Sequence, residues 1–230
     1  MSLPTRRVQF AHFLLHKVRE LRFRLSELLD VCQTSRRRFS VQDPMASSDC
    51  RLVNFHFSAF SSLIQTIKDI LPVVAGHEVT WSDLANVQHI QFMQAVRNAV
   101  THDGNPVINL WIEGRYYVAC DILRLGQNQN PIRIQAPADD IETLVIRFTA
   151  ELCSHLRDTV SLILKSEALK GPLYGVEFFD SAVDHPAFPE FARRLYVEAD
   201  RSAPEMNGDD PVAEILMELD VLIGICHSQE

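Results

Sequence analysis

Apolar residues recur every three to four positions along much of the chain, which is the pattern of amphipathic helices. The first of these stretches predicts one long helix from about residue 5 to residue 33. Its apolar side is formed by Phe10, Phe13, Leu14, Leu21, Leu25, Leu28 and Leu29. A polar connector that contains three consecutive arginines follows. A second helix is predicted from about 49 to 71, ending at Pro72 and Gly76 because proline lacks the backbone donor that a helix needs.

Two further helices are indicated by their capping residues. Ser82 is a suitable N-cap for a third helix, which should run to about His102 and stop at the turn sequence of residues 103–106. A fourth helix is predicted from about 140 to 166, because Asp139 can accept a hydrogen bond from the amide three residues on. The chain up to this point is therefore expected to be mostly helical.

Between the third and fourth helices the period of the pattern changes from 3.6 to 2, which is typical of strands. Three strands are predicted, at residues 107–112, 115–123 and 131–135. The turns between them contain Gly114 and Gly126. Because consecutive strands joined by short turns pair with each other, we expect a small three-stranded antiparallel β-meander inserted after the third helix, over residues 107–135.

The rest of the chain predicts two shorter helices. One is expected at about 187–199 and the other at about 211–226, with a loop over residues 202–210 between them. The fold class is therefore mainly α. We expect a helical domain at residues 1–168, which includes the meander, and a helical C-terminal appendage at 169–230, either separate or packed on the same core.

Composition narrows the class of protein. The chain has 230 residues, of which 47% are hydrophobic, so it can bury one substantial core. A formal net charge of −8 argues against a protein that coats nucleic acid, although residues 1–51 are net basic. The five cysteines form no Cys-x-x-Cys pair, and no run of about 18 apolar residues occurs. We therefore expect a reduced, cytoplasmic protein without a membrane span.

The last turns of the predicted third helix collect polar side chains on a single face. At about 100° per residue, four polar residues lie opposite Phe92, namely Arg97, Asn98, Thr101 and His102. A guanidinium can donate two hydrogen bonds to phosphate oxygens, and an imidazole can take and release a proton near neutral pH. Asn98 is four residues before His102 and can orient its ring or a ribose hydroxyl. These side chains suit RNA cleavage by the RNA's own 2′-hydroxyl, which needs no metal ion.

The same residues also suit the end of an ordinary helix. Arginine and histidine in the last turns interact favourably with the negative end of the helix dipole, and Asp103-Gly104-Asn105 is a common helix stop. Spacing alone favours this structural interpretation, because short arginine and histidine patterns are frequent.

The segment from Arg97-Asn98 to Thr101-His102, followed by Asp103-Gly104-Asn105, resembles the Arg-Asn-x-x-x-His signature of the HEPN superfamily. The resemblance implies an antiparallel helical bundle in which the motif closes one helix. It also implies a metal-independent endoribonuclease that acts on RNA as a homodimer. Arg97 would bind the scissile phosphate, His102 would be the acid/base group and Asn98 would support their geometry.

Family members of this kind include toxins of toxin–antitoxin and phage-defence systems, so the resemblance also implies an antitoxin protein as a partner. Some members lack cleavage activity and serve as binding modules. A non-catalytic protein- or nucleotide-binding module is therefore the alternative function.

Candidate RNA contacts outside the three catalytic positions are Arg36, Arg37, Arg38 and Thr101. Clustered cations can guide a phosphate backbone toward a cleft. A flexible basic loop explains the three arginines equally well. His12 and His16 have the i, i+4 spacing of a metal-binding pair, but no third ligand accompanies them, so we expect neither a metal nor a cofactor.

Overall fold

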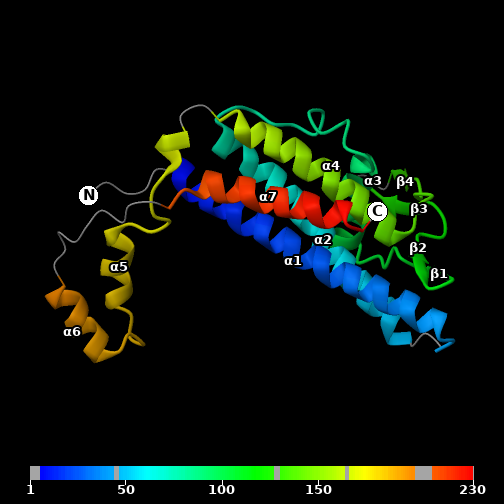
Figure 1. Cartoon of the computed structure of the whole chain (residues 1–230), viewed down its shortest axis with the longest axis horizontal. Helices are drawn as coiled ribbons and strands as arrows, with labels where there is room; N and C mark the ends of the chain where they lie inside the picture. Colours follow the sequence, from blue (N-terminus) through cyan, green and yellow to red (C-terminus); the bar gives the residue numbers. More distant parts are fainter. Residues whose placement is uncertain (1–5, 44–46, 127–129, 164–165, 200–208, 230) are drawn as a thin grey trace.

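The computed structural model describes residues 6–43, 47–126, 130–163, 166–199 and 209–229. Within these residues the chain is mainly helical, and its helices form a bundle with two small sheets at one end (Figure 1). Helices α1 (Arg6–Ser40) and α2 (Ser47–Ala75) are a long antiparallel pair. Arg7, at the start of α1, donates a hydrogen bond of 2.7 Å to the carbonyl of Val74, at the end of α2.

Three more helices complete the core. Helix α3 (Ile90–His102) packs on α2, while α4 (Ile141–Ser161) and α7 (Pro211–His227) pack on each other and on α1. Buried side chains of all five helices belong to one hydrophobic cluster. At its centre Phe60 of α2 and Phe148 of α4 meet edge to face, with ring centroids 6.4 Å apart. The mainly α class predicted from the sequence is confirmed.

Helix α1 continues through the three consecutive arginines, so their predicted place in a connector is wrong. A β-hairpin packs over its last turns. Trp111 of this hairpin donates a hydrogen bond of 2.8 Å to Ser35 Oγ and meets Phe39 edge to face at 5.8 Å. Gly114, with φ +80°, approaches α1 so closely that a Cβ there would lie 2.9 Å from the Cα of Arg36. These contacts from a distant part of the chain keep the end of α1 helical.

Helix α2 does not stop at Pro72, as predicted, but continues to Ala75. Leu71 and Val74 are both fully buried, so the additional turn removes apolar surface from water. This gain offsets the hydrogen bond that Pro72 cannot donate. Gly76, with φ +79°, ends the helix, and its amide donates to the carbonyl of Pro72 at 2.9 Å.

Helix α3 begins at Ile90 rather than at the predicted N-cap Ser82. The preceding segment forms tight turns in which Asp83 accepts hydrogen bonds from the amide and hydroxyl of Thr80, at 2.7 and 2.8 Å. Such side-chain bonds to nearby backbone compete with helix formation. His89, with φ +63°, then redirects the chain into the helix.

Among the described residues the predicted three-stranded meander is not found, because four short strands form two separate antiparallel pairs there. They are β1 (Leu110–Ile112) with β2 (Arg115–Tyr117), and β3 (Ile122–Leu125) with β4 (Pro131–Ile134). The strand predicted over 115–123 is interrupted because two of its residues form hydrogen bonds between side chain and backbone with residues outside it. Asn109 accepts a hydrogen bond from the amide of Ala119, and Asp121 accepts one from the amide of Ala136, both at 2.9 Å. The turn after Gly126 lies mostly outside the described residues.

The helix expectations for the C-terminal part are largely confirmed. Helix α4 ends at Ser161, five residues earlier than expected, and Asp140 rather than Asp139 is its N-cap. Helix α6 (Glu190–Glu198) lies within three residues of its predicted bounds, and helix α7 begins at its predicted residue and ends one residue later than predicted. The 3₁₀ helix η2 (Ser166–Leu169) and helix α5 (Val176–Val183) were not predicted.

The helices after residue 168 differ in how they pack on the bundle. Helices α5 and α6 project away from the bundle (Figure 1), whereas α7 contributes Ile215, Leu219 and Leu222 to the core. The loop predicted at 202–210 lies mostly outside the described residues, and the domain boundary at 168 stays a prediction. No described helix is long and apolar enough to cross a membrane.

Replacing Leu219 by alanine should destabilise the whole bundle by about 2–5 kcal/mol, because this fully buried side chain would leave a cavity. Urea unfolding followed by both circular dichroism and tryptophan fluorescence measures the effect. Met217→Ala, two residues away at a position 68% exposed, is the control and should change stability by less than about 0.5 kcal/mol. A fluorescence midpoint that stays unchanged in Leu219→Ala would show that α7 unfolds independently of the tryptophan-containing segments.

Candidate functional site

The predicted motif occupies the last turns of α3 and the turn that ends this helix. The amides of Asp103 and Asn105 both donate to the carbonyl of Ala99 at 3.2 Å, and Gly104 takes φ +64°, a conformation that favours glycine. Arg124 of β3 binds the Asp103 carboxylate through two nitrogens, at 2.8 and 3.2 Å. The hydrogen bond from Arg124 lowers the pKa of Asp103. The β3–β4 hairpin therefore anchors the end of the helix that carries the motif.

The three predicted catalytic residues lie together on one face of α3. Arg97 Nη1 donates a hydrogen bond of 2.9 Å to Asn98 Oδ1 and lies 3.5 Å from His102 Nε2. Arg97 and Asn98 are half-buried, whereas His102 is exposed. A single guanidinium nitrogen thus adjoins both the amide and the imidazole, and the imidazole is open to a ligand from solvent.

The Arg97 side chain reaches this face from a narrow gap between α2 and α3. Gln65 of α2, Trp81 and Gln94 line the gap with it. Its Nε atom is buried and has no hydrogen-bond partner in the described part of the chain. Arg97 also forms no ion pair with any described carboxylate. The cation is therefore held in place by packing while its charge stays available to an anion.

One carboxylate of α2 lies within the electrostatic reach of this cation. Burial opposes ionisation of Asp69, but hydrogen bonds from Gln65 and Lys68 outweigh it and lower the pKa of Asp69, and the charge of Arg97 adds to this effect. Asp69 Oδ1 accepts hydrogen bonds from both of those side chains, at 2.8 and 2.9 Å. Its negative charge is thus already engaged by neighbours on its own helix.

Two residues that sequence reasoning missed adjoin the motif. Ser62 of α2 lies with its hydroxyl 3.4 Å from that of Thr101, and it also donates to the carbonyl of Ser58 at 2.8 Å. No pattern in the sequence indicates this neighbour, since it depends on how α2 and α3 pack. Arg124 had a weak signal, because it is a basic residue in the strand region that follows the motif.

The three consecutive arginines do not join the motif. Arg38 binds Asp49, at the start of α2, at 2.5 Å. The motif residue Thr101 contacts Ser62, which lies farther along the same helix. Asp49 and Ser62 are roughly 20 Å apart along the axis of α2. Arg36 forms an ion pair of 2.7 Å with Glu142. The third arginine, at position 37, is exposed and has no carboxylate partner in the part of the chain described. RNA contact by these residues stays a prediction.

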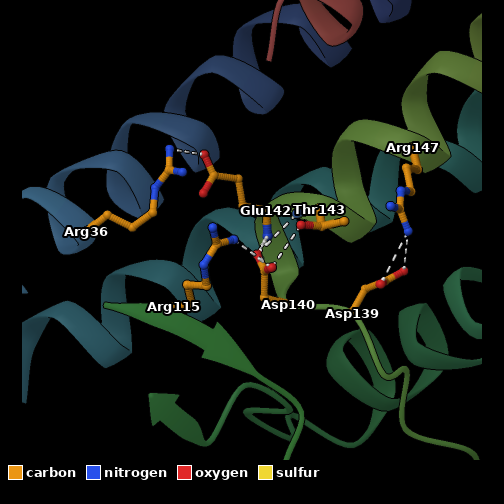
Figure 2. Close-up of polar contacts among 7 residues, drawn as sticks. All are labelled: Arg36, Arg115, Asp139, Asp140, Glu142, Thr143 and Arg147. Atoms are coloured by element: carbon orange, nitrogen blue, oxygen red, sulfur yellow. Dashed lines mark hydrogen bonds and ion pairs between the residues drawn. The ribbon is translucent and has the colours of Figure 1, made fainter. Parts of the chain in front are cut away.

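Arg36 belongs to a polar network at the start of α4 (Figure 2). Asp140 accepts hydrogen bonds from the amides of Glu142 and Thr143 and from the Thr143 hydroxyl, and Arg115 of β2 donates to it at 2.9 Å. Glu142 is only 5% exposed, and desolvation raises its pKa although the charge of Arg36 opposes the shift. The network joins α1, β2 and α4, which indicates a structural role for Arg36.

The described residues contain no cluster of three histidine, cysteine or acidic side chains that could hold a metal ion. Of the histidine pair considered in the sequence, His12 hydrogen bonds through Nε2 to the carbonyl of Gly171 at 2.8 Å, and His16 is exposed. The two rings therefore face different surroundings.

Replacing Arg36 by alanine should destabilise the fold by about 1–2 kcal/mol, because the buried Glu142 carboxylate loses its ion-pair partner. The cost is moderated because the Arg36 side chain is itself 39% exposed. The matched control is Arg37→Ala, which should change stability by less than about 0.5 kcal/mol. Thermal and urea unfolding of both variants checks this, and equal midpoints would contradict a structural role for Arg36.

Comparisons with known proteins return no match, whether with protein-family models, with curated proteins or with solved structures. The function proposed below therefore rests on the residues of α3 and on their surroundings.

Proposed function

We propose that the chain is a metal-independent endoribonuclease of the HEPN type. The observation that carries the proposal is the open polar face at the end of α3, where one nitrogen of Arg97 lies within 3.5 Å of both Asn98 and His102. This arginine has no carboxylate partner among the described residues, so its planar guanidinium can bind a phosphate through two hydrogen bonds. The exposed imidazole beside it can reach the same ligand.

The chemistry needs only proton transfer and charge stabilisation. The 2′-oxygen of one nucleotide attacks the adjacent phosphorus, so a bond from phosphorus to the 2′-oxygen forms and the bond to the 5′-oxygen breaks. A base removes the proton from the 2′-hydroxyl, and an acid gives a proton to the departing 5′-oxygen. Arg97 would stabilise the charge on the phosphate oxygens and His102 would carry one of the two protons. The products are a 2′,3′-cyclic phosphate and a 5′-hydroxyl.

Two proton transfers call for two groups, and each chain supplies one histidine at this face. A homodimer in which two motifs face a common cleft would supply both. The exposure of His102 supports this arrangement, because the imidazole is accessible to a second copy as well as to RNA. A role as the toxin of a toxin–antitoxin or phage-defence pair, with an antitoxin protein as partner, is part of the same proposal.

Replacing His102 by alanine should reduce the rate of RNA cleavage by about 10² to 10⁴-fold, which is the usual contribution of a general acid or base. The assay uses single-stranded RNA in the presence of a chelator and detects 2′,3′-cyclic phosphate ends by mass spectrometry.

The matched control is His227→Ala, at an exposed histidine that ends α7, and this variant should cleave like the wild type. Equal cleavage by the wild type and His102→Ala would overturn the proposal. Absence of cleavage in both would also overturn it and would favour the non-catalytic binding module.

The dimer can be tested separately. Multi-angle light scattering at micromolar concentration should give twice the mass of the 26.2 kDa chain. Mixing His102→Ala chains with Arg97→Ala chains gives dimers in which neither motif is intact. If each cleft needs both motifs intact, the activity of this mixture should stay below that of the wild type. A mass of one chain at every concentration tested would contradict the two-motif cleft.

A further inference from the structure

A cavity of about 630 Å³ opens at the end of α3 that lies away from the motif. Three segments line it: the turn before α3, the first turns of α3, and the residues that join β4 to α4. In the sequence these are residues 85–92, Ala95 and residues 133–138. The volume is in the range of sites that hold small organic ligands.

The lining combines an apolar floor with a rim of neutral polar groups. Val87, Ile90 and Ile134 are buried and provide the floor. The rim carries four exposed carboxamide side chains, those of Asn86, Gln88, Gln91 and Gln135. A carboxamide both donates and accepts hydrogen bonds, so this rim can recognise a ligand with mixed donors and acceptors.

The charged groups at the cavity are already engaged. Arg133 forms an ion pair with Asp121, and His89 Nε2 lies 3.1 Å from a carboxylate oxygen of Asp139. Arg133 and His89 each lie beside a carboxylate, which weakens the attraction of this lining for a phosphate. The lining therefore fits a neutral group with apolar faces and polar edges better than an anion.

The cavity lies on the same stripe of α3 as the candidate site. Gln91 and Ala95 line the cavity, and Asn98 and His102 follow them at i+7 and i+11 from Gln91, which is the spacing of one helix face. Gln91 and His102 are roughly 16 Å apart along the axis. The β3–β4 pair flanks both ends, since Arg124 contacts Asp103 and Arg133 lines the cavity. One extended RNA strand can therefore contact both the cavity and the candidate site.

We propose that this cavity binds a base of the RNA strand whose scissile phosphate lies at Arg97 and His102. The inference rests on the proposed function and adds a determinant of substrate choice to it. A nucleobase has flat apolar faces and donors and acceptors on its edges, and single-stranded RNA presents both to a protein. The floor matches the faces, and the carboxamide rim matches the edges.

Calorimetric titration with the four nucleoside monophosphates tests the proposal without any cleavage, since these ligands contain no scissile bond. At least one of them should bind to the wild type and to His102→Ala with equal affinity. The double variant Gln91→Ala/Gln135→Ala should bind it roughly tenfold more weakly, because two hydrogen-bonding groups are lost. Gln229→Ala changes an exposed glutamine that follows α7 and does not line the cavity, and this variant should bind like the wild type.

Ribose 5-phosphate, which has no base, can reach only the proposed phosphate site at Arg97, so it should bind more weakly than the nucleotide. Equal binding of ribose 5-phosphate and a nucleotide, absence of nucleotide binding at millimolar concentration, or unchanged affinity in the double variant would each overturn the proposal. Cleavage of RNA without nucleotide binding would contradict only the proposed base site. Nucleotide binding without cleavage would contradict the proposed nuclease function.

A test without cavity variants uses an RNA oligonucleotide that contains 4-thiouridine, a photoreactive base. Irradiation with His102→Ala should attach it to the peptides of residues 85–95 or 133–138. Attachment only elsewhere would contradict the base site.

Discussion

Helix α1 buries residues along nearly its whole length, and α2, α4 and α7 all pack against it. Its inward side is mostly apolar and includes Val18, Leu21 and Leu25, which have no exposed surface. Removal of this apolar surface from water is the main favourable term in the fold, because it is roughly proportional to area. One of the two small sheets also depends on this helix, since the β1–β2 hairpin packs on the last turns of α1.

The candidate site depends on the division of α3 into two faces. Met93, Val96 and Ala99 are fully buried against the core, so the residues between them must face outward or sideways. The packing that holds the helix thereby presents Arg97 and His102 on its open side. The same geometry extends the polar stripe back to the cavity at the start of α3, so a single helix supports both proposed contacts with RNA.

Neighbouring carboxylates decide which cations can act on a ligand. Arg36, Arg38 and Arg124 each bind an acidic side chain, whereas Arg97 is next to an amide and an imidazole. A count of basic residues in the sequence does not separate these cases. The net charge of −8 is therefore compatible with one local phosphate site, because what matters at short range is the set of partners around each guanidinium.

The sequence by itself determined the helical class, most of the helices and the shared face of Arg97, Asn98 and His102, because helical periodicity is local information. Tertiary structure decided the rest. It extended α1 past Arg36 and α2 past Pro72, since contacts with distant residues stabilise those turns. It also split the expected meander at Ala119 and brought Ser62 and Arg124 to the motif. Such contacts join residues far apart in the chain, and no local pattern records them.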